Sequence, residues 1–263
     1  MRAMGRDTSK SASRPEPRVA GVPARDSGYF IGTSGWHYKH WRSAFYPEKL
    51  PVKEWLAFYS QHMDTVELNT TFYRLPPPGA AKQWRSTVPP AFCFAAKGSR
   101  FLTHMKKLRD PEVGVARFFE RIEGLGSQLG PIVFQLPPQW PIDEARLSDF
   151  LDILPRRRYA FEFRNATWET KAIYRLLARH NAAVCIFELD HYQSPLEITA
   201  DFTYIRLHGP GGKYQGSYDD KTLHCWAKRI ENWGLTASYI YFDNDQAGYA
   251  VKNALRLREI LKL

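Results

Sequence analysis

Eight short runs of apolar, β-branched and aromatic residues recur along the chain and predict eight β-strands. Seven stretches with apolar residues at helical spacing predict α-helices. The strands are expected at residues 29–36, 65–73, 92–97, 131–137, 159–164, 182–189, 202–208 and 238–244, and the helices at 52–63, 80–87, 111–125, 142–154, 170–180, 219–233 and 246–261. The interval 190–201 contains Pro195 and is too short for a full helix, so an irregular crossover is predicted there.

This alternation of strands and helices is typical of an α/β fold with a parallel sheet. Eight such units over residues 29–263, with no linker between them, predict one domain, a single (β/α)8 barrel of the TIM type. An open doubly wound sheet is the alternative. It is less favoured because the first strand, IGTSGW at residues 31–36, leads into an aromatic loop and lacks the glycine-rich turn that binds dinucleotides.

Polar residues stand where the predicted strands end, which is the working face of such barrels. Because alternate side chains of a strand share a face, three pairs are expected to point toward the barrel axis, namely Glu67 with Asn69, Glu162 with Arg164, and Arg206 with His208. Their apolar neighbours are then expected to face the helices; these are Val66, Leu68, Phe161, Phe163, Ile205 and Leu207. The basic run 156–158 precedes the fifth strand and is expected to be solvated at the opposite end.

Composition adds a preference for anionic partners. The net charge of +10 and the pI of about 9.5 favour attraction to phosphates or nucleic acid. Residues 1–28 hold six Lys or Arg, three Asp or Glu and no aromatic residue, so a disordered basic tail is expected there. Three widely spaced cysteines, no apolar run of membrane-spanning length and no signal-peptide core predict a cytoplasmic protein without a membrane partner. The oligomeric state is left open.

Seven segments together carry a family resemblance. They are IGTSGWHYKHW (31–41), ELNTTFYRLP (67–76), FAAKGSRFLTH (94–104), FQLPPQW (134–140), FEFRNATW (161–168), IRLHGPGGKYQGSY (205–218) and YFDNDQAGYAVKNA (241–254). From about residue 29 to its end the chain resembles the YecE-like family, known as domain of unknown function 72. The resemblance implies an eight-stranded TIM-type barrel and no particular reaction. Asp243 departs from it, because an amide is expected there, and Glu188 ends the sixth strand beside the irregular crossover.

Glu67, Glu162, His208 and Asp243 are the candidate catalytic residues. A carboxylate near arginines stays ionised and can act as a base, whereas one in an apolar pocket can stay protonated and act as an acid. The alternative is a structural network in which the glutamates only neutralise nearby cations. No cofactor is identified, and a divalent metal is less favoured because one histidine and three neighbouring cations suit few metal sites.

Lys97, Arg164 and Arg206 form a candidate anion clamp, since guanidinium groups match the oxygens of phosphate and carboxylate. Lys97 has an alternative role as a Schiff-base nucleophile, because neighbouring cations lower the pKa of a lysine. Further ligand contacts are expected from strand-end amides, namely Asn69, Gln135 and Asn244.

The loop after the seventh strand, HGPGGKYQGSY, is a candidate phosphate-binding loop. Backbone N–H groups around Gly211, Gly212 and Lys213 can approach phosphate oxygens, although a plain flexible turn explains the glycines equally well.

The first loop, residues 36–47, alternates aromatic and cationic side chains. This composition is typical of single-stranded nucleic-acid binding, and equally of a lid whose aromatic side chains pack over the barrel mouth. Four aromatic residues are expected to line the cleft, namely Trp36, Tyr38, Tyr73 and Trp168.

Two function classes follow. The first is an enzyme that acts by acid/base chemistry, such as hydrolysis or isomerisation, on a phosphorylated sugar, a nucleotide or a nucleic acid. The second is a non-catalytic nucleic-acid or ligand-binding protein that uses the same cationic, aromatic cleft. A purely structural Glu–Arg network remains the third interpretation of the mouth.

Overall fold

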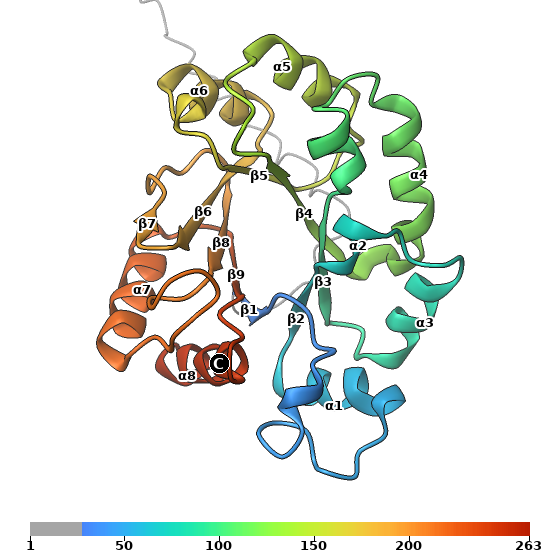
Figure 1. The fold of residues 1–263 in the computed structure, drawn as a ribbon, viewed down its shortest axis with the longest axis vertical. Coiled ribbons are helices and arrows are strands. Elements are labelled where there is room, and N and C mark those ends of the chain that lie inside the picture. The colour runs from blue at the N-terminus through green and yellow to red at the C-terminus, as the bar shows by residue number, and fades with distance from the viewer. Residues whose placement is uncertain (1–27) are drawn as a thin grey trace, which may run out of the picture.

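The eight predicted strands form a nearly closed parallel barrel in the computed structural model, which describes residues 28–263 (Figure 1). The barrel strands are β1 Tyr29–Thr33, β2 Thr65–Leu68, β3 Cys93–Lys97, β4 Leu129–Leu136, β5 Tyr159–Phe163, β6 Ala183–Leu189, β8 Phe202–Leu207 and β9 Ala237–Phe242. Their order is β1-β9-β8-β6-β5-β4-β3-β2. The prediction of a TIM-type barrel is confirmed. The predicted tail at 1–28 falls, except for Gly28, outside the described residues.

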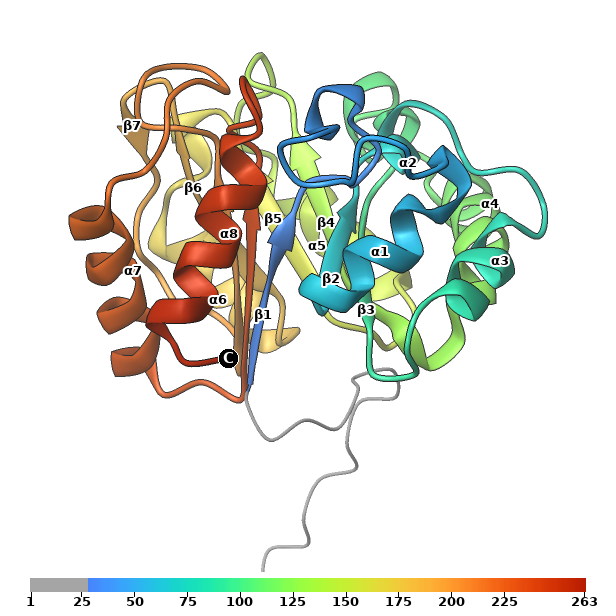
Figure 2. The same cartoon turned by 90° about the horizontal axis from the view of Figure 1, so that it is seen from below.

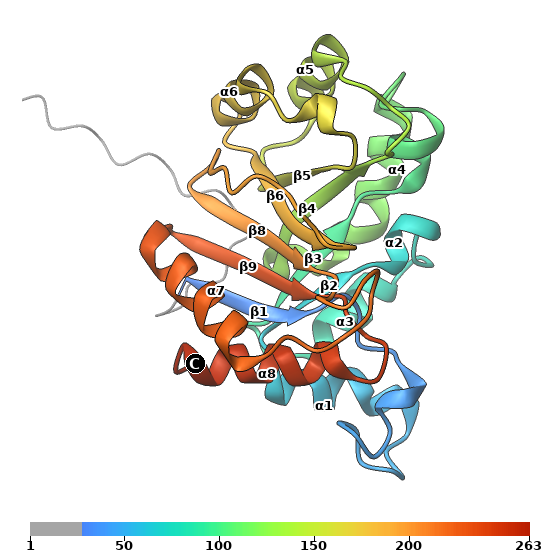
Figure 3. The same ribbon diagram turned by 60° about the vertical axis from the view of Figure 1, so that its left-hand side comes forward.

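Helices cover the outside of this barrel (Figure 3). They are α1 Trp55–His62, α2 Thr70–Tyr73, α3 Ala80–Thr87, α4 Glu112–Ile122, α5 Glu144–Ile153, α6 Lys171–Arg179, α7 Asp220–Trp233 and α8 Tyr249–Ile260. Three of them begin after a residue whose side chain accepts a backbone N–H of the first turn, namely Asp143, Thr170 and Asp219. No helix in residues 28–263 is long and apolar enough to cross a membrane.

Two predicted strands are too long, and the reason is local. The first ends at Thr33 and the second at Leu68, where residues 65–73 were expected to continue. Asn69 adopts a helical conformation and the Thr71 hydroxyl donates to the Leu68 carbonyl, so the chain turns into α2. The irregular sixth crossover is confirmed, because a two-residue strand, β7 Tyr192–Gln193, folds back antiparallel to β6.

Strand alternation divides the core into two clusters, as predicted. Val66, Phe161 and Ile205 belong to the large cluster between sheet and helices. The inside of the barrel combines small residues with tyrosines; it contains Cys93, Ala95, Ala160, Ala183, Cys185, Ala237, Tyr204, Tyr239 and Tyr241. Small side chains on β3, β5 and β6 therefore leave the space that the tyrosines of β8 and β9 fill.

Arg158 closes the amino-terminal end of the barrel. Its guanidinium donates to the Tyr239 hydroxyl at 3.0 Å and lies over the Phe202 ring at 5.0 Å. The expectation that the whole run 156–158 is solvated is therefore wrong for Arg158, because a guanidinium can stack on the aromatic rings that end the barrel core.

The seam between β1 and β2 is held by a side chain from α1. Outside an isolated bridge between Ser34 and Glu67, these strands share no ladder among residues 28–263. The Tyr59 hydroxyl accepts the Thr33 N–H at 3.1 Å and lies 3.1 Å from the Thr65 carbonyl, to which it donates. One hydroxyl thus replaces part of the missing ladder.

All eight barrel strands run in the same direction, so the loops that follow them gather at one end (Figure 2). This end, the barrel mouth, receives the polar strand ends.

Candidate active site

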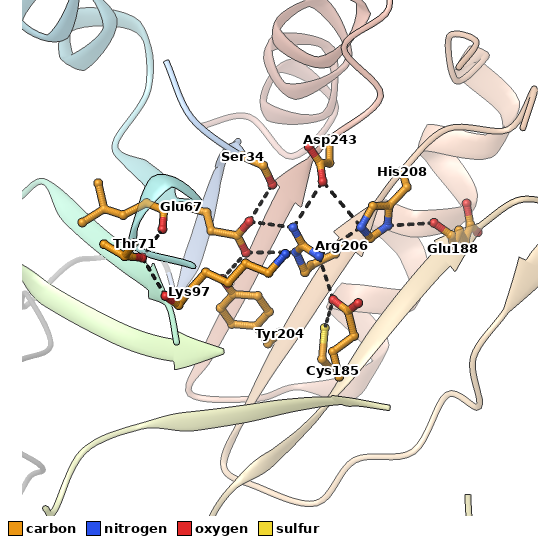
Figure 4. A network of polar contacts seen from close by, with 12 residues as sticks. Ser34, Glu67, Thr71, Lys97, Cys185, Glu188, Tyr204, Arg206, His208 and Asp243 are labelled. Carbon is orange, nitrogen blue, oxygen red and sulfur yellow. Dashed lines mark hydrogen bonds and ion pairs between the residues drawn. The ribbon is translucent and has the colours of Figure 1, made fainter. Parts of the chain in front are cut away.

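A ring of charged side chains lines the mouth and meets at one guanidinium, Arg206 of β8 (Figure 4). Arg206 is 1% exposed. Its five N–H groups face five acceptors: Glu67 Oε2 at 3.0 Å, Glu67 Oε1 at 2.9 Å, Glu162 Oε2 at 2.8 Å, Asp243 Oδ2 at 3.2 Å and His208 Nε2 at 3.0 Å. A guanidinium has five donors, so none of Arg206 remains for a ligand.

Glu67 and Glu162 are the fully buried anions of this network. Burial alone would raise the pKa of Glu67, but Arg206 and then Lys97 lower it below its ordinary value. Burial opposes ionisation of Glu162 as well, and two arginines, Arg164 first, hold its pKa well below the usual range. Both glutamates are therefore ionised.

The oxygens of Glu67 are occupied further by neutral donors. The Ser34 hydroxyl donates to Oε1 at 2.7 Å and the Tyr204 hydroxyl donates to Oε2 at 2.6 Å. A carboxylate with this many donors is a poor proton acceptor, because protonation would break several charge-assisted hydrogen bonds.

His208 is held as a neutral imidazole. Nδ1 lies 3.0 Å from the Glu188 carbonyl, an acceptor, so Nδ1 carries the proton and Nε2 accepts from Arg206 and, at 3.3 Å, from Arg164. Burial, followed by the charge of Arg206, lowers the pKa of His208 well below its ordinary value. The Glu188 side chain faces the helices, where Tyr218 is a hydrogen-bond partner, so this carboxylate is not part of the mouth.

Arg164 is the more accessible guanidinium, with a side chain 10% exposed. It forms an ion pair with Glu162 through Nε, and its Cζ lies 4.5 Å from the centre of the Phe187 ring. The Nε proton is donated to Glu162, and one Nη2 proton is donated to His208. Within residues 28–263, its other three N–H groups have no protein acceptor and are available to a ligand.

Lys97 ends β3 next to this network and is 6% exposed. Its ammonium lies 4.5 Å from the centre of the Phe72 ring, and the part of the chain that the structure describes offers it no hydrogen bond or ion pair. Burial, followed by the like charge of Arg206, lowers the pKa of Lys97 to about 8.

Asp243 is the remaining carboxylate and the most open of the three, with a side chain 12% exposed. Arg206 donates to it, and His208 Nε2 lies 3.5 Å from the same oxygen. Burial, with a contribution from Glu67, outweighs the attraction of Arg206 and raises the pKa of Asp243 to about 7. Asp243 and Lys97 thus change protonation near neutral pH.

A pocket of about 370 Å³ lies beside the mouth, between the loops after β1 and β2. Its lining residues are Gly35, Trp36, His37, Tyr38, Leu68, Asn69, Thr70, Tyr73 and Trp84. The Asn69 Oδ1 atom is buried and has no hydrogen-bond partner among residues 28–263. Trp84 was not predicted; it comes from α3, and nothing in the sequence near residue 84 indicates contact with the first loop.

The other aromatic side chains of the first loop are packed inward. Trp41 and Tyr46 are buried, Tyr46 stacks on Trp55 at 4.6 Å, and the Trp41 indole donates to Asp245 at 2.8 Å. This part of the loop is therefore a satellite core, which leaves Trp36 and Tyr38 as its ligand-facing candidates. Trp168 is fully buried against Phe163 and does not line the mouth, so the expectation for Trp168 is wrong.

The glycine-rich loop after β8 is closed on itself. The Gly209 N–H donates to the Tyr218 hydroxyl and the Gly211 N–H to the Gln215 carbonyl. Asn244 is fully buried and donates to the Gly216 carbonyl at 2.9 Å, which fastens this loop to the end of β9. The Asn244 amide N–H groups and the Gly211 N–H are therefore already engaged, whereas Asn244 Oδ1 is buried without a partner among the described residues.

The remaining predicted binding residues are positioned differently. Gln135 lies beside Glu162 in the sheet and is half-buried at the mouth. Backbone N–H groups of Gly212 and Lys213 have no hydrogen bond to the described residues. No group of three or more His, Cys, Asp or Glu residues in the described chain could hold a metal ion.

Comparison with known proteins identifies the family. Residues 30–263 match the family model described as protein of unknown function DUF72, and the chain belongs to this family. Relatives include the UPF0759 protein YunF of Bacillus subtilis strain 168, 23% identical over 89% of this chain and 95% of the relative. The UPF0759 protein YecE of Escherichia coli K12 is 31% identical over 54% of this chain and 50% of the relative.

Solved structures of the same family share the fold. A DUF72 family protein from Thermotoga maritima MSB8 is 25% identical, with a TM-score of 0.81 over 90% of this chain and all of that chain. Another from Enterococcus faecalis V583 is 18% identical, with a TM-score of 0.78 over 89% of this chain and 96% of that chain. The family resemblance inferred from the sequence is thereby confirmed.

Proposed function

We propose that this DUF72 barrel is an enzyme that acts on a small anionic substrate, such as a phosphorylated sugar or a nucleotide, by proton transfer at the barrel mouth. The observation that carries the proposal is the pair Asp243 and Lys97, whose pKa values of about 7 and about 8 lie on either side of physiological pH. Groups with such pKa values at the strand ends of a barrel are typical of acid/base catalysts.

The other charged residues support this pair in different ways. Arg164 supplies free N–H donors for an anion. Glu67 and Glu162, which the sequence offered as bases, have their oxygens occupied by donors and hold Arg206 in place. In the proposed division of roles, Asp243 accepts and returns the proton, and the Glu–Arg–Glu network keeps its surroundings rigid.

The pocket beside the mouth supports an organic substrate with a ring. Aromatic walls from Trp36, Tyr73 and Trp84 can stack on a sugar or base, and the unpartnered Asn69 oxygen can accept a hydrogen bond from it. Tyr38 lines this pocket and is near Asp243, whose charge raises the pKa of Tyr38 after the larger effect of burial.

A panel of phosphorylated sugars and nucleotides tests the proposal by calorimetry and by thermal melting. A true ligand should bind the Arg164→Gln variant about tenfold more weakly or worse, because a charge-assisted hydrogen bond is lost. The Asp243→Asn variant should still bind it and lose about a hundredfold or more of turnover. Arg179→Gln, on the exposed face of α6, is the matched control. Equal affinity of the Arg164 and Arg179 variants would contradict the proposal.

Nucleic-acid binding is the second candidate function, favoured by the segment after β3. Residues 100–109 contain four Lys or Arg and no acidic residue, and Phe101 and Met105 are exposed on a π-helical turn. Lys107 and Leu108 adopt positive φ angles, a strain that is often kept at functional sites. Such a mixture of cations and exposed apolar groups can track phosphates and stack on bases.

A further inference from the structure

Lys97 is a buried cation at the mouth that forms no ion pair with a carboxylate of the described residues. Arg206 and Arg164 both contact carboxylates directly. The Lys97 ammonium instead lies over the Phe72 ring at 4.5 Å, and the carboxylates of Glu162, Glu67 and Asp243 act on it only at longer range. A cation–π contact compensates only part of the cost of burying a charge. The amine is therefore kept under conditions that favour loss of its proton.

The backbone of Lys97 is fixed at the end of its strand. The Thr71 hydroxyl, whose one proton is shared between the Leu68 and Lys97 carbonyls, lies 2.6 Å from the Lys97 carbonyl, and Lys97 pairs with Val133 of β4. Gln135 comes two residues later on β4 and lies partly open at the mouth. The amine of Lys97 thus projects from a rigid element toward the axis, on the same side as Glu67, Arg206 and Asp243 (Figure 4).

We infer that Lys97 is a nucleophilic amine that forms an imine with an aldehyde or ketone bearing a phosphate or carboxylate group. The inference rests on the proposed function, because Arg164 must hold the anionic end of the compound while Lys97 attacks its carbonyl carbon. The lowered pKa of Lys97, about 8, agrees with this role, since an appreciable fraction of the amine is then neutral at physiological pH.

The chemical step needs no oxidant or reductant. The lone pair of the neutral amine forms a C–N bond to the carbonyl carbon, and the carbonyl oxygen takes up a proton to give a carbinolamine. The C–O bond then breaks, a C=N bond forms, and the oxygen leaves as water with the two protons that the amine has lost. In this proposal Asp243, which exchanges its proton near pH 7 and acts electrostatically on the Lys97 ammonium, relays these protons.

A purely electrostatic role for Lys97 is the competing explanation, because its charge also offsets Glu67 and Glu162. The two roles differ in what the Lys97→Arg variant retains. Arginine keeps the charge and cannot form a stable imine, so it preserves an electrostatic function and abolishes imine formation. Lys97→Met removes both and tests whether the fold tolerates the loss.

Reductive trapping with glycolaldehyde phosphate and sodium cyanoborohydride tests the inference on the full-length protein. The cyanoborohydride hydride adds to the imine carbon and leaves a stable secondary amine, which peptide mass spectrometry locates. At pH 7.5 Lys97 should be labelled on the order of tenfold faster than the exposed Lys228, because the lower pKa leaves more of the amine neutral. Unphosphorylated glycolaldehyde should label Lys97 about tenfold more slowly, because it lacks the anion that Arg164 holds.

The variants separate the inference from the proposed function. Lys97→Arg should bind inorganic phosphate as the wild type does and gain no label at residue 97, whereas Lys228→Met should leave the labelling of Lys97 unchanged. If Lys97 stays unlabelled while Arg164-dependent binding of the probe persists, the imine inference is wrong and the proposed function stands. If neither phosphate nor the probe binds in an Arg164-dependent way, the proposed function itself is wrong.

Discussion

The three carboxylates of the mouth differ in the number of donors that they face. Glu67 faces four and has a lowered pKa, whereas Asp243 faces one guanidinium donor and has a raised pKa. Hydrogen bonding and burial thus keep the Glu67 carboxylate charged and allow the Asp243 carboxylate to titrate. This division is the physical reason for placing proton transfer on Asp243.

Replacement of Asp243 by Asn should change how stability depends on pH. A pKa raised to about 7 means that folding opposes ionisation, so the contribution of Asp243 to stability is lost as pH rises from its unfolded value, near 4, to about 7. Asn cannot ionise and its oxygen can still accept from Arg206. Asp243→Asn should therefore exceed the wild type in stability at pH 8 by on the order of 1–2 kcal/mol, and by less at pH 5.

Urea unfolding at pH 5 and pH 8 measures this difference. Asp149→Asn, on the exposed face of α5, is the control and should show no comparable change between the two pH values. A variant that is destabilised equally at both pH values would show that Asp243 is ionised throughout as a structural ion pair.

Strand parity allowed the axis-facing residues to be predicted, because the two-residue period of a strand is independent of the rest of the fold. It placed Glu67, Glu162 and Arg206 together correctly. It did not reveal that Arg206 uses all five donors internally, since this depends on the side-chain conformations of residues from four strands. Trp168 was misplaced because an aromatic residue just after a strand can pack on either side of the loop.

At the level of elements, the barrel closes unevenly. In residues 28–263, seven neighbouring strand pairs form ladders, with a register shift between β3 and β4, whereas β1 and β2 are joined by one bridge and the Tyr59 hydroxyl. The backbones approach closely here, because a Cβ on Gly32 would meet the Thr65 carbonyl at 2.1 Å. The strand pattern in the sequence predicted eight strands, yet it contained no information on which pair would lack a full ladder.

Tyr59→Phe should weaken this seam. The substitution keeps the ring and leaves the buried Thr33 N–H and Thr65 carbonyl without their partner, at a cost of about 1–3 kcal/mol. The matched control is Tyr174→Phe, because the buried Tyr174 hydroxyl has no hydrogen-bond partner in the described part of the chain and its removal should cost little. Chemical denaturation measures both variants, and hydrogen exchange at the Thr33 amide reports the seam directly. Equal effects of the two substitutions would mean that the hydroxyl does not hold the strands together.

At the scale of the whole molecule, positive charge is unevenly arranged relative to the mouth. The charged network at the mouth is close to neutral when Asp243 is ionised, since Glu67, Glu162 and Asp243 then offset Lys97, Arg164 and Arg206. The excess cations lie elsewhere, and the segment 100–109 carries four of them beside the mouth. A net charge of +10 alone would attract any polyanion. A test of nucleic-acid binding therefore has to compare the loss of cations at different positions with the total charge held equal.

Three altered proteins, each with a net charge lower by three, distinguish binding at the segment 100–109 from attraction by total charge. The first replaces Lys106, Lys107 and Arg109 with Gln. The second replaces exposed lysines of the outer helices, Lys221, Lys228 and Lys252, and the third removes residues 1–27, which hold six cations and three anions. If the segment after β3 binds single-stranded DNA, only the first alteration should make the plot of log affinity against log salt less steep. The slope should fall in magnitude by about 2, because each of the three lost phosphate contacts contributes about 0.7. Fluorescence anisotropy over a salt series measures the slope. An equal loss in all three proteins would mean that binding follows total charge, and the barrel mouth would then have no role in it.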